Sequence, residues 1–278
     1  VVADHSDNMG FFPDMFAGAP HILSDPTGKD WYNRIQAGEG VGVALELIGL
    51  FSQGQFPESL VYTPDSKPYK QAWARTVEAA ERFNEPGRFT AFIGYEWTSL
   101  IKGNNMHRVV VYRDGGEKGG QMVPFTTYPP QGSTNPRDLW NWLEEYEEKT
   151  GGDVLAIPHN GNLANGIMFP ETAQWNGRAL DEAYVVQRAT WEPMYEATQI
   201  KGDGETHPFL SPNDEFADYE TWDKGNLNLS EPKSDDMLAG EYARSALKTG
   251  LKLEERLGTN PYKFGMIGST DSHTSLAT

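Results

Sequence analysis

The chain contains no cysteine among its 278 residues. This absence excludes a disulfide framework, a thiolate nucleophile and a metal site with thiolate ligands. Any metal ion would therefore have to be bound by histidine, aspartate and glutamate side chains. Histidine is itself scarce, with six residues in the chain, so the position of each one is informative.

Basic residues are also few. The chain has 23 Lys and Arg against 40 Asp and Glu, which gives a formal net charge of −17. Proteins that bind nucleic acids or anionic lipid surfaces need basic surface, so we expect neither partner. Hydrophobic residues make up 38% of the chain and charged residues 23%, which is the composition of a folded domain.

Long apolar runs are missing as well. No stretch approaches the roughly 20 apolar residues of a membrane span, and no basic region precedes an apolar run at the start. The apolar triplet 1–3 looks like the end of a strand, and a strand at 264–268 lies close to the other end. We therefore expect one domain over residues 1–278 that is incomplete at both ends, from either the cytoplasm or the periplasm.

The apolar pattern predicts helices that alternate with strands. The expected helices cover residues 69–84, 136–149 and 235–257, and the expected strands cover 89–94, 109–112, 154–157, 195–200 and 264–267. Such alternation indicates an α/β fold with a parallel sheet, either open or closed into a barrel. Two tracts rich in Pro, Gly, Asp and Asn, at about 8–33 and 201–233, are expected to be long loops.

Ionisable residues follow several of these apolar runs directly. In chain order they are Asp4 and His5, then Glu96, then His159, and finally Asp271 and His273. The C-terminal ends of parallel strands meet at one mouth of an α/β fold, so these side chains should converge. His107 would have to reach the same cluster from the beginning of a strand.

This set of residues suits a particular chemistry. Imidazole and carboxylate ligands together favour Zn, Mn or Fe. A carboxylate among histidines can also bridge two cations about 3.5–4 Å apart, and Glu96 is the candidate for this role. A single histidine is more often an ordinary surface or core residue, and His21 is left in that class. His207, in the second long loop, could either contact substrate or order the loop.

The same residues lie in short sequence motifs that resemble the polymerase and histidinol phosphatase (PHP) superfamily, and more closely an uncharacterised bacterial branch of it. The matching motifs are spread over the whole chain: residues 3–8, 94–98, 105–108, 157–162, 199–208 and 269–273. The resemblance implies a distorted seven-stranded TIM-like (β/α) barrel with two or three divalent metal ions at its mouth. Characterised members hydrolyse phosphoesters.

The resemblance also implies a role for each candidate ligand. Glu96 would be the bridging carboxylate, with His107 and His159 completing one metal site. Asp271 would bind a second metal ion. His5 and His273 would bind a third ion, and Asp4 would orient a metal-bound histidine. The superfamily's opening H-x-H pair is missing from this sequence, which we attribute to truncation.

Together these observations predict a metal-dependent hydrolase of small molecules. A phosphoesterase that uses metal-activated hydroxide on an anionic or phosphorylated substrate is the leading hypothesis. Arg108 or Lys201 would stabilise developing negative charge, and His207 would protonate the leaving group. The oligomeric state is left open.

Two alternatives stay open. Related barrels use the same metal chemistry on amides, lactones and carboxylic esters, so an amidohydrolase-like enzyme is the first alternative. The second is a non-catalytic carbohydrate- or ligand-binding barrel, with Trp97, Trp191 and Trp222 as binding platforms.

Overall fold

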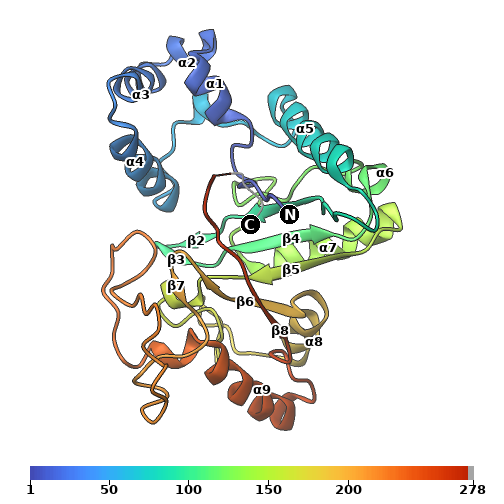
Figure 1. The fold of residues 1–278 in the computed structure, drawn as a ribbon, viewed down its shortest axis with the longest axis vertical. Helices are drawn as coiled ribbons and strands as arrows, with labels where there is room; N and C mark the ends of the chain where they lie inside the picture. Colours follow the sequence, from blue (N-terminus) through green and yellow to red (C-terminus); the bar gives the residue numbers. More distant parts are fainter. Residues whose placement is uncertain (275–278) are drawn as a thin grey trace.

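Three small β-sheets lie at the centre of the computed structural model, which describes residues 1–274 apart from the side chain of residue 52 (Figure 1). The first has the order β1-β4-β5, the second is the hairpin β2-β3, and the third has the order β7-β6-β8. The strands are β1 (Gly94–Trp97), β2 (Leu100–Ile101), β3 (Asn104–Asn105), β4 (Arg108–Tyr112), β5 (Val154–Pro158), β6 (Met194–Gln199), β7 (Gly202–Asp203) and β8 (Gly265–Gly268).

The expected (β/α) barrel is wrong, because the sheets have two or three strands and none closes on itself within the described residues. Strand β4 runs antiparallel to both β1 and β5, and among the paired strands only β6 and β8 are parallel. A parallel crossover needs about a dozen or more residues, usually a helix. The link 98–107 between β1 and β4 instead contains the hairpin β2-β3, which returns the chain in the opposite direction.

The first strand is also displaced from its expected position. Regular pairing begins at Gly94, opposite Val111, and not at residue 89. The apolar triplet 1–3 is not a regular strand, and pairing in this segment is a single parallel bridge between His5 and Glu96. Glu96 therefore lies inside a strand, paired on both sides, and not in the loop that follows one.

Capping explains where the longer helices begin. α5 (Lys67–Phe83) follows Ser66, whose side chain accepts a hydrogen bond from the backbone of Tyr69. α7 (Pro136–Thr150) is capped by Asn135 in the same way. The helix expected at 235–257 is divided into a 3-10 turn (Leu238–Gly240) and α9 (Ala243–Leu257), because the intervening Tyr242 is extended.

The expected loop at 8–33 is wrong, since most of it is helical. It contains α1 (Phe11–Ala17), α2 (Pro20–Ser24) and the start of α3 (Pro26–Gln36), and α4 (Gly40–Ser52) follows. Pro20 and Pro26 begin helices at the first position, and Pro13 lies in the first turn of α1, so none of the three interrupts a helix. The tract 201–233 contains β7 and otherwise consists of turns and irregular backbone.

Helices cover the sheets on several sides. The remaining elements are the 3-10 turns Glu58–Leu60 and Gly161–Leu163, α6 (Gly116–Gly119) and α8 (Glu182–Trp191). Figure 1 shows α1–α4 grouped at the top left, α5 and α6 at the right, and α9 at the bottom. Aromatic side chains fill much of the core, including the contact between Tyr112 of β4 and Tyr146 of α7, whose rings are 5.0 Å apart.

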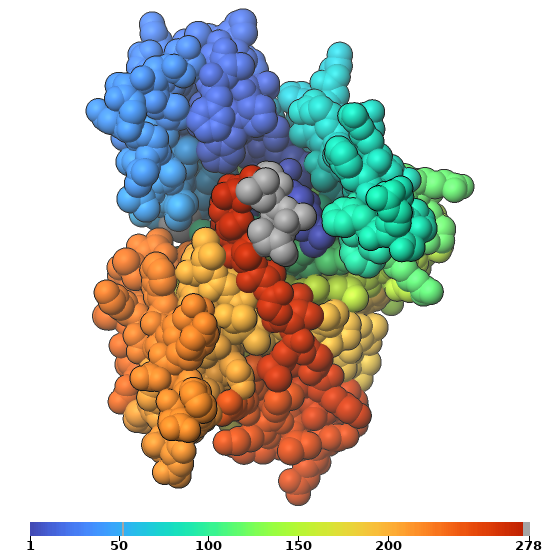
Figure 2. All heavy atoms as spheres, in the orientation of Figure 1, coloured from blue at the N-terminus to red at the C-terminus, as the bar shows by residue number. Residues whose placement is uncertain are grey.

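The last part of the chain brings the two ends of the sequence together. Figure 2 shows the red segment after α9 running across the visible face toward the blue N-terminal segment. His273 in this segment packs beside His5, with 5.7 Å between the ring centroids. No helix within residues 1–274 is long and apolar enough to cross a membrane.

Candidate metal centre

The register of the first sheet brings three site residues to one edge. Trp97 pairs with Arg108, and Arg108 pairs with Pro158. Because β4 is antiparallel to its neighbours, its beginning lies beside the ends of β1 and β5. His107, just before β4, and His159, just after β5, therefore both lie next to Glu96.

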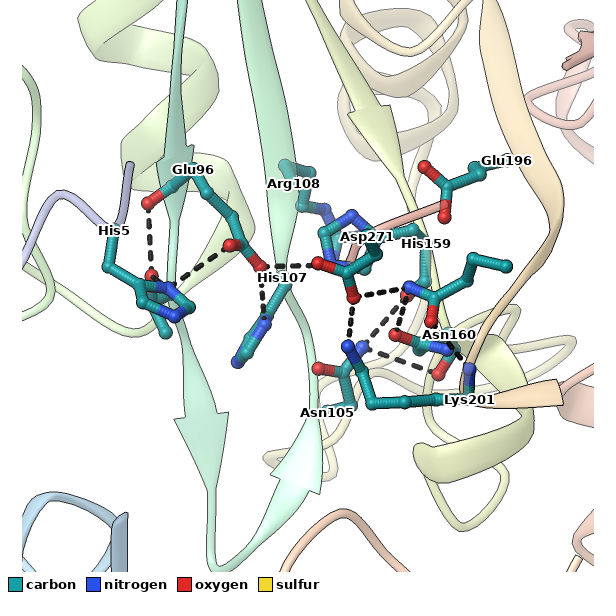
Figure 3. A network of polar contacts seen from close by, with 12 residues as sticks. His5, Glu96, Asn105, His107, Arg108, His159, Asn160, Glu196, Lys201 and Asp271 are labelled. Carbon is teal, nitrogen blue, oxygen red and sulfur yellow. Dashed lines mark hydrogen bonds and ion pairs between the residues drawn. The ribbon is translucent and has the colours of Figure 1, made fainter. Parts of the chain in front are cut away.

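These three residues, which we call the central group, are in close contact. Glu96 Oε1 lies 2.7 Å from His107 Nδ1 and 2.9 Å from His159 Nε2 (Figure 3). All three side chains are buried, and one ligand atom from each lies within 4.8 Å of the others. The central group could hold a metal ion.

Unpartnered nitrogen atoms support this fit. Within residues 1–274, His107 Nε2 and both ring nitrogens of His159 are buried without a hydrogen-bond partner, and of these His159 Nε2 is the one that lies close to Glu96. Buried polar atoms in native proteins almost always have a partner, so these atoms call for one. Metal bonds of about 2.0–2.1 Å would separate neighbouring ligand atoms by about 2.9–3.4 Å. The two contacts of Glu96 Oε1, at 2.7 and 2.9 Å, lie at or just below this range.

His5 contacts the other oxygen of the Glu96 carboxylate. Backbone hydrogen bonds from Ser6 N to Glu96 O (2.7 Å) and from Glu96 N to Asp4 O (2.8 Å) fix this segment beside β1. His5 Nδ1 then lies 3.0 Å from Glu96 Oε2 and 2.8 Å from Thr98 Oγ1. The side chain of His5 is 40% exposed, so the cluster is open to solvent on this side.

Asp271 and His273 lie at the margin of the cluster. The Asp271 carboxylate pairs with Lys201 and accepts a hydrogen bond of 2.6 Å from Gln199. His273 Nδ1 lies 3.4 Å from Asp271 Oδ1, and its ring packs on His5. Asp271, His273 and Asn160 all have positive φ angles, an uncommon backbone state that is concentrated at functional sites.

The carboxylate and the rings shift one another's pKa values. Burial by itself would raise the pKa of Glu96, but His5 and His107 hold it well below its ordinary value. Burial lowers the pKa of His107 to about 4. Burial also opposes protonation of His5, but Glu96, with Asp271 and Asp7, raises its pKa to about 9. Glu96 likewise raises the pKa of His159 against the effect of burial.

Arg108 is not positioned to act on a substrate. Its guanidinium is fully buried, where Nε donates to Glu192 Oε1 (3.0 Å) and Nη1 to Met106 O (2.6 Å). Glu192 also pairs with Arg188, at 3.0 Å. This burial favours a structural role for Arg108 beside the candidate metal centre over the expected role in stabilising substrate charge.

His207 is likewise held by its own loop. Its Nε2 donates to Asp223 Oδ2 at 2.8 Å, and its Nδ1 accepts from the backbone N–H of Phe209 at 3.1 Å. Both ring nitrogens are thus occupied, which favours the loop-ordering role over that of a general acid. Within residues 1–274, the contact of Asp4 with the cluster is made by its backbone and not by its carboxylate.

Two further residues of this region, Gln199 and Glu196, were not predicted from the sequence. Gln199 donates from Nε2 both to Asp271 and to Asn160 Oδ1, the latter at 2.6 Å. Glu196 is buried in β6, and its electrostatic effect reaches His159. An acidic residue inside the apolar run 195–200 is a signal that could have identified Glu196.

Comparison with known proteins gives a family match over the whole chain. The model of the family described as "Protein of unknown function (DUF3604)" matches residues 1–278. No curated protein and no solved structure matches. No PHP family model matches, so the assignment to that superfamily is corrected, and the ligand roles taken from it must rest on the geometry above.

Proposed function

The chain belongs to the DUF3604 family of proteins of unknown function, and we propose on the evidence of its central group that it is a metal-dependent hydrolase. The leading substrate class is phosphoesters. The observation that carries the proposal is the buried Glu96 carboxylate, which contacts three histidines through its two oxygens.

The donor set fits a catalytic metal better than a structural one. Two imidazoles and one carboxylate make a three-ligand site, which leaves a position for water or substrate. A bound Zn, Mn or Fe ion would supply Lewis acidity and lower the pKa of a coordinated water molecule. Because Glu96 Oε2 also contacts His5, its carboxylate is placed to serve a second ion, so we propose two or three ions.

Access to the site supports the same proposal. The central group is buried, whereas His5 and His273 on one side of it have side chains that are 40% and 55% exposed. A small molecule can approach from this side, while the opposite side is closed by the packed Arg108 side chain. A metal ion with only a structural role would not need such an opening.

Among the described residues, Lys201 supplies a cation at the edge of the site. Its ammonium pairs with Asp271 and is 24% exposed, so it can turn toward an anionic substrate group. With the metal ions it would offset the negative charge that a phosphoryl group carries into a strongly acidic protein. This feature is why phosphoesters are placed ahead of amides and carboxylic esters.

The non-catalytic binding alternative loses most of its support. Trp97 is fully buried and Trp191 is 8% exposed, so neither can offer a ring face to a ligand. Of the three platforms considered, only Trp222 is accessible, at 45% exposure. A single exposed ring does not make a carbohydrate-binding surface.

A substrate panel tests the proposal. The purified protein would be loaded with Zn, Mn or Fe and assayed on phosphomonoesters, phosphodiesters, carboxylic esters and amides. We expect phosphoester hydrolysis that Glu96→Gln abolishes and that His207→Gln, a change outside the cluster, leaves intact. Activity on carboxylic esters or amides alone would show that these, and not phosphoesters, are the substrate class. Inactivity of the metal-loaded protein on every substrate would refute the proposal.

A further inference from the structure

We propose that Glu196 is a positioning residue that accepts a hydrogen bond from His159 Nδ1 and so directs His159 Nε2 toward Glu96. The inference rests on the proposed metal site but not on hydrolysis. It assigns a role to a buried carboxylate that the central group does not include.

Glu196 and His159 each have a buried polar atom without a hydrogen-bond partner among the described residues. Glu196 is 6% exposed, and its Oε2 accepts a hydrogen bond of 2.5 Å from Ser269 Oγ. Its other oxygen, Oε1, is buried and has no hydrogen-bond partner among the described residues. His159 Nδ1 is in the same condition. One atom is an acceptor and the other can be a donor, so each can satisfy the other.

Glu196 and His159 belong to neighbouring segments of the fold. His159 follows β5, Glu196 lies in β6, and these two strands are in contact. Glu196 is close enough to raise the pKa of His159 electrostatically, after the larger effects of burial and Glu96. Figure 3 draws Glu196 beside His159. The terminal torsion of a glutamate is soft, so a small carboxylate rotation can align Oε1 with the ring.

The two ring nitrogens of His159 have different roles in this arrangement. Nε2 of His159 lies 2.9 Å from Glu96 Oε1, so it is the nitrogen that faces the metal position. A metal-bound histidine commonly donates its other ring N–H to a carboxylate, which fixes the tautomer and the ring orientation. We assign this role to Glu196, whose Oε1 is a buried carboxylate oxygen of β6 without a partner among the described residues.

Local backbone geometry supports a built arrangement. The pairing of β6 with β8 is interrupted by a register shift between Glu196 and Thr198. An irregularity of this kind can reorient a neighbouring side chain. Because Ser269 stands two residues before Asp271, the Glu196 carboxylate also connects the end of β5 with the segment that carries Asp271.

The first experiment needs no metal. Ring ¹⁵N spectra of the metal-free protein report which nitrogen of each histidine carries a proton. The signal of His159 is identified as the one that disappears in His159→Asn. We expect a protonated Nδ1 in the wild type and a shift toward the Nε2–H tautomer in Glu196→Ala. An unprotonated Nδ1 in the wild type, or an unchanged spectrum in Glu196→Ala, would overturn the proposal.

The second experiment measures zinc affinity by competition with a chelator. We expect Glu196→Ala to weaken binding about 10- to 100-fold, the usual effect of removing such a partner. Glu196→Gln keeps one acceptor oxygen and should fall between Glu196→Ala and the wild type. Ser269→Ala, which leaves both Glu196 oxygens in place, is the matched control and should bind like the wild type.

The two readouts separate this inference from the proposed function. If Glu196→Ala does not fold, the test is made with Glu196→Gln and the control Ser269→Ala. Equal zinc affinity and equal ring spectra in the wild type, Glu196→Gln and Ser269→Ala would then refute the positioning role. If the wild type binds zinc but hydrolyses nothing, the proposed function fails while the positioning role is still decided. If it binds no zinc, the ring spectra decide it alone.

Discussion

His107 Nδ1 lies 2.7 Å from Glu96 Oε1, although the two residues belong to segments that run in opposite directions. Their contact is fixed by the antiparallel register of β1 and β4, which is itself fixed by packing of the buried faces. A slip of one residue would turn every side chain of a strand to the other face. The geometry of the central group therefore follows from the pairing of the sheet.

This relationship predicts that Glu96→Gln removes metal binding while the fold survives. The amide keeps the shape of the side chain but loses the charge that holds three imidazoles together. We expect zinc affinity to fall by at least about 10- to 100-fold, measured by chelator competition, with an unchanged circular dichroism spectrum.

The matched control is Glu148→Gln, which alters an exposed carboxylate on α7. It changes the net charge by the same amount, so it isolates the effect of position from that of charge. Wild-type affinity in Glu96→Gln would show that the ion, if any, binds elsewhere.

The raised pKa of His5 predicts a pH dependence of stability in the metal-free protein. Its folded pKa of about 9 exceeds the ordinary value of 6.5, so His5 stabilises the fold fully below pH 6.5. This contribution is lost as the pH rises through 9. His107, with a pKa of about 4, acts in a separate window, because its stabilising effect is lost as the pH falls from 6.5 through 4.

Urea unfolding between pH 6.5 and 9 measures the His5 contribution. We expect the unfolding midpoint of the wild type to fall over this range and that of His5→Gln to fall less. A residual slope is expected in the variant because the pKa of His159 is raised as well. Identical slopes in the two proteins would contradict the assigned His5–Glu96 interaction.

Metal binding should release protons at neutral pH. A histidine must be deprotonated at the nitrogen that binds the ion, and His5 is protonated at pH 7 in the metal-free protein. Calorimetric titration with zinc in buffers of different ionisation enthalpy counts these protons. We expect His5→Gln to release about one proton fewer than the wild type. Equal proton release would remove His5 from the ligand set.

The buried charges behind the centre predict a stability order. Glu192 pairs with both Arg108 and Arg188, at 3.0 Å in each case. Glu192→Leu leaves two buried guanidinium groups without their carboxylate partner and should lower the free energy of unfolding by about 3–5 kcal/mol. Arg108→Met leaves the Arg188–Glu192 pair intact, so its cost should be smaller.

The same variants test whether Arg108 has a structural role or acts on the substrate. Unfolding in urea gives the stability order, and a folded Arg108→Met protein should keep the wild-type zinc affinity and kcat. A large loss of kcat at unchanged stability would return Arg108 to the substrate site.

Much of the site could be predicted from sequence because metal-ligand residue types at strand ends are a local pattern. His5, Glu96 and His159 each follow an apolar run, and the structure brings them together. His107 did not fit a parallel sheet, and the antiparallel direction of β4 explains its presence. The partner of a long side chain is not a local property, so the pairing of Arg108 with Glu192, 84 residues away, could not be predicted from sequence.

The architecture was less predictable for a related reason. Apolar runs reveal strands but not their directions, so alternating helices and strands suggested a barrel that the described sheets do not form. Composition also misled at 8–33, where Pro20 and Pro26 begin helices and Asp25 caps the second of them. Glu196 was overlooked because a buried carboxylate inside a strand is recognised only by the neighbours that surround it.

Lys201 allows a prediction in which two measured quantities move in opposite directions. Its ammonium pairs with Asp271 beside the metal centre, where a positive charge opposes the binding of a cation. Lys201→Met should therefore bind zinc more tightly, by roughly 3- to 10-fold, while Lys201→Arg keeps the charge and the wild-type affinity. Hydrolysis of phosphomonoesters should nevertheless decline in Lys201→Met, because the cation that we propose to face the substrate is lost. Partial unfolding would weaken both properties together, so it cannot imitate this pattern. Weaker zinc binding in Lys201→Met would show instead that Lys201 orders Asp271 for the metal.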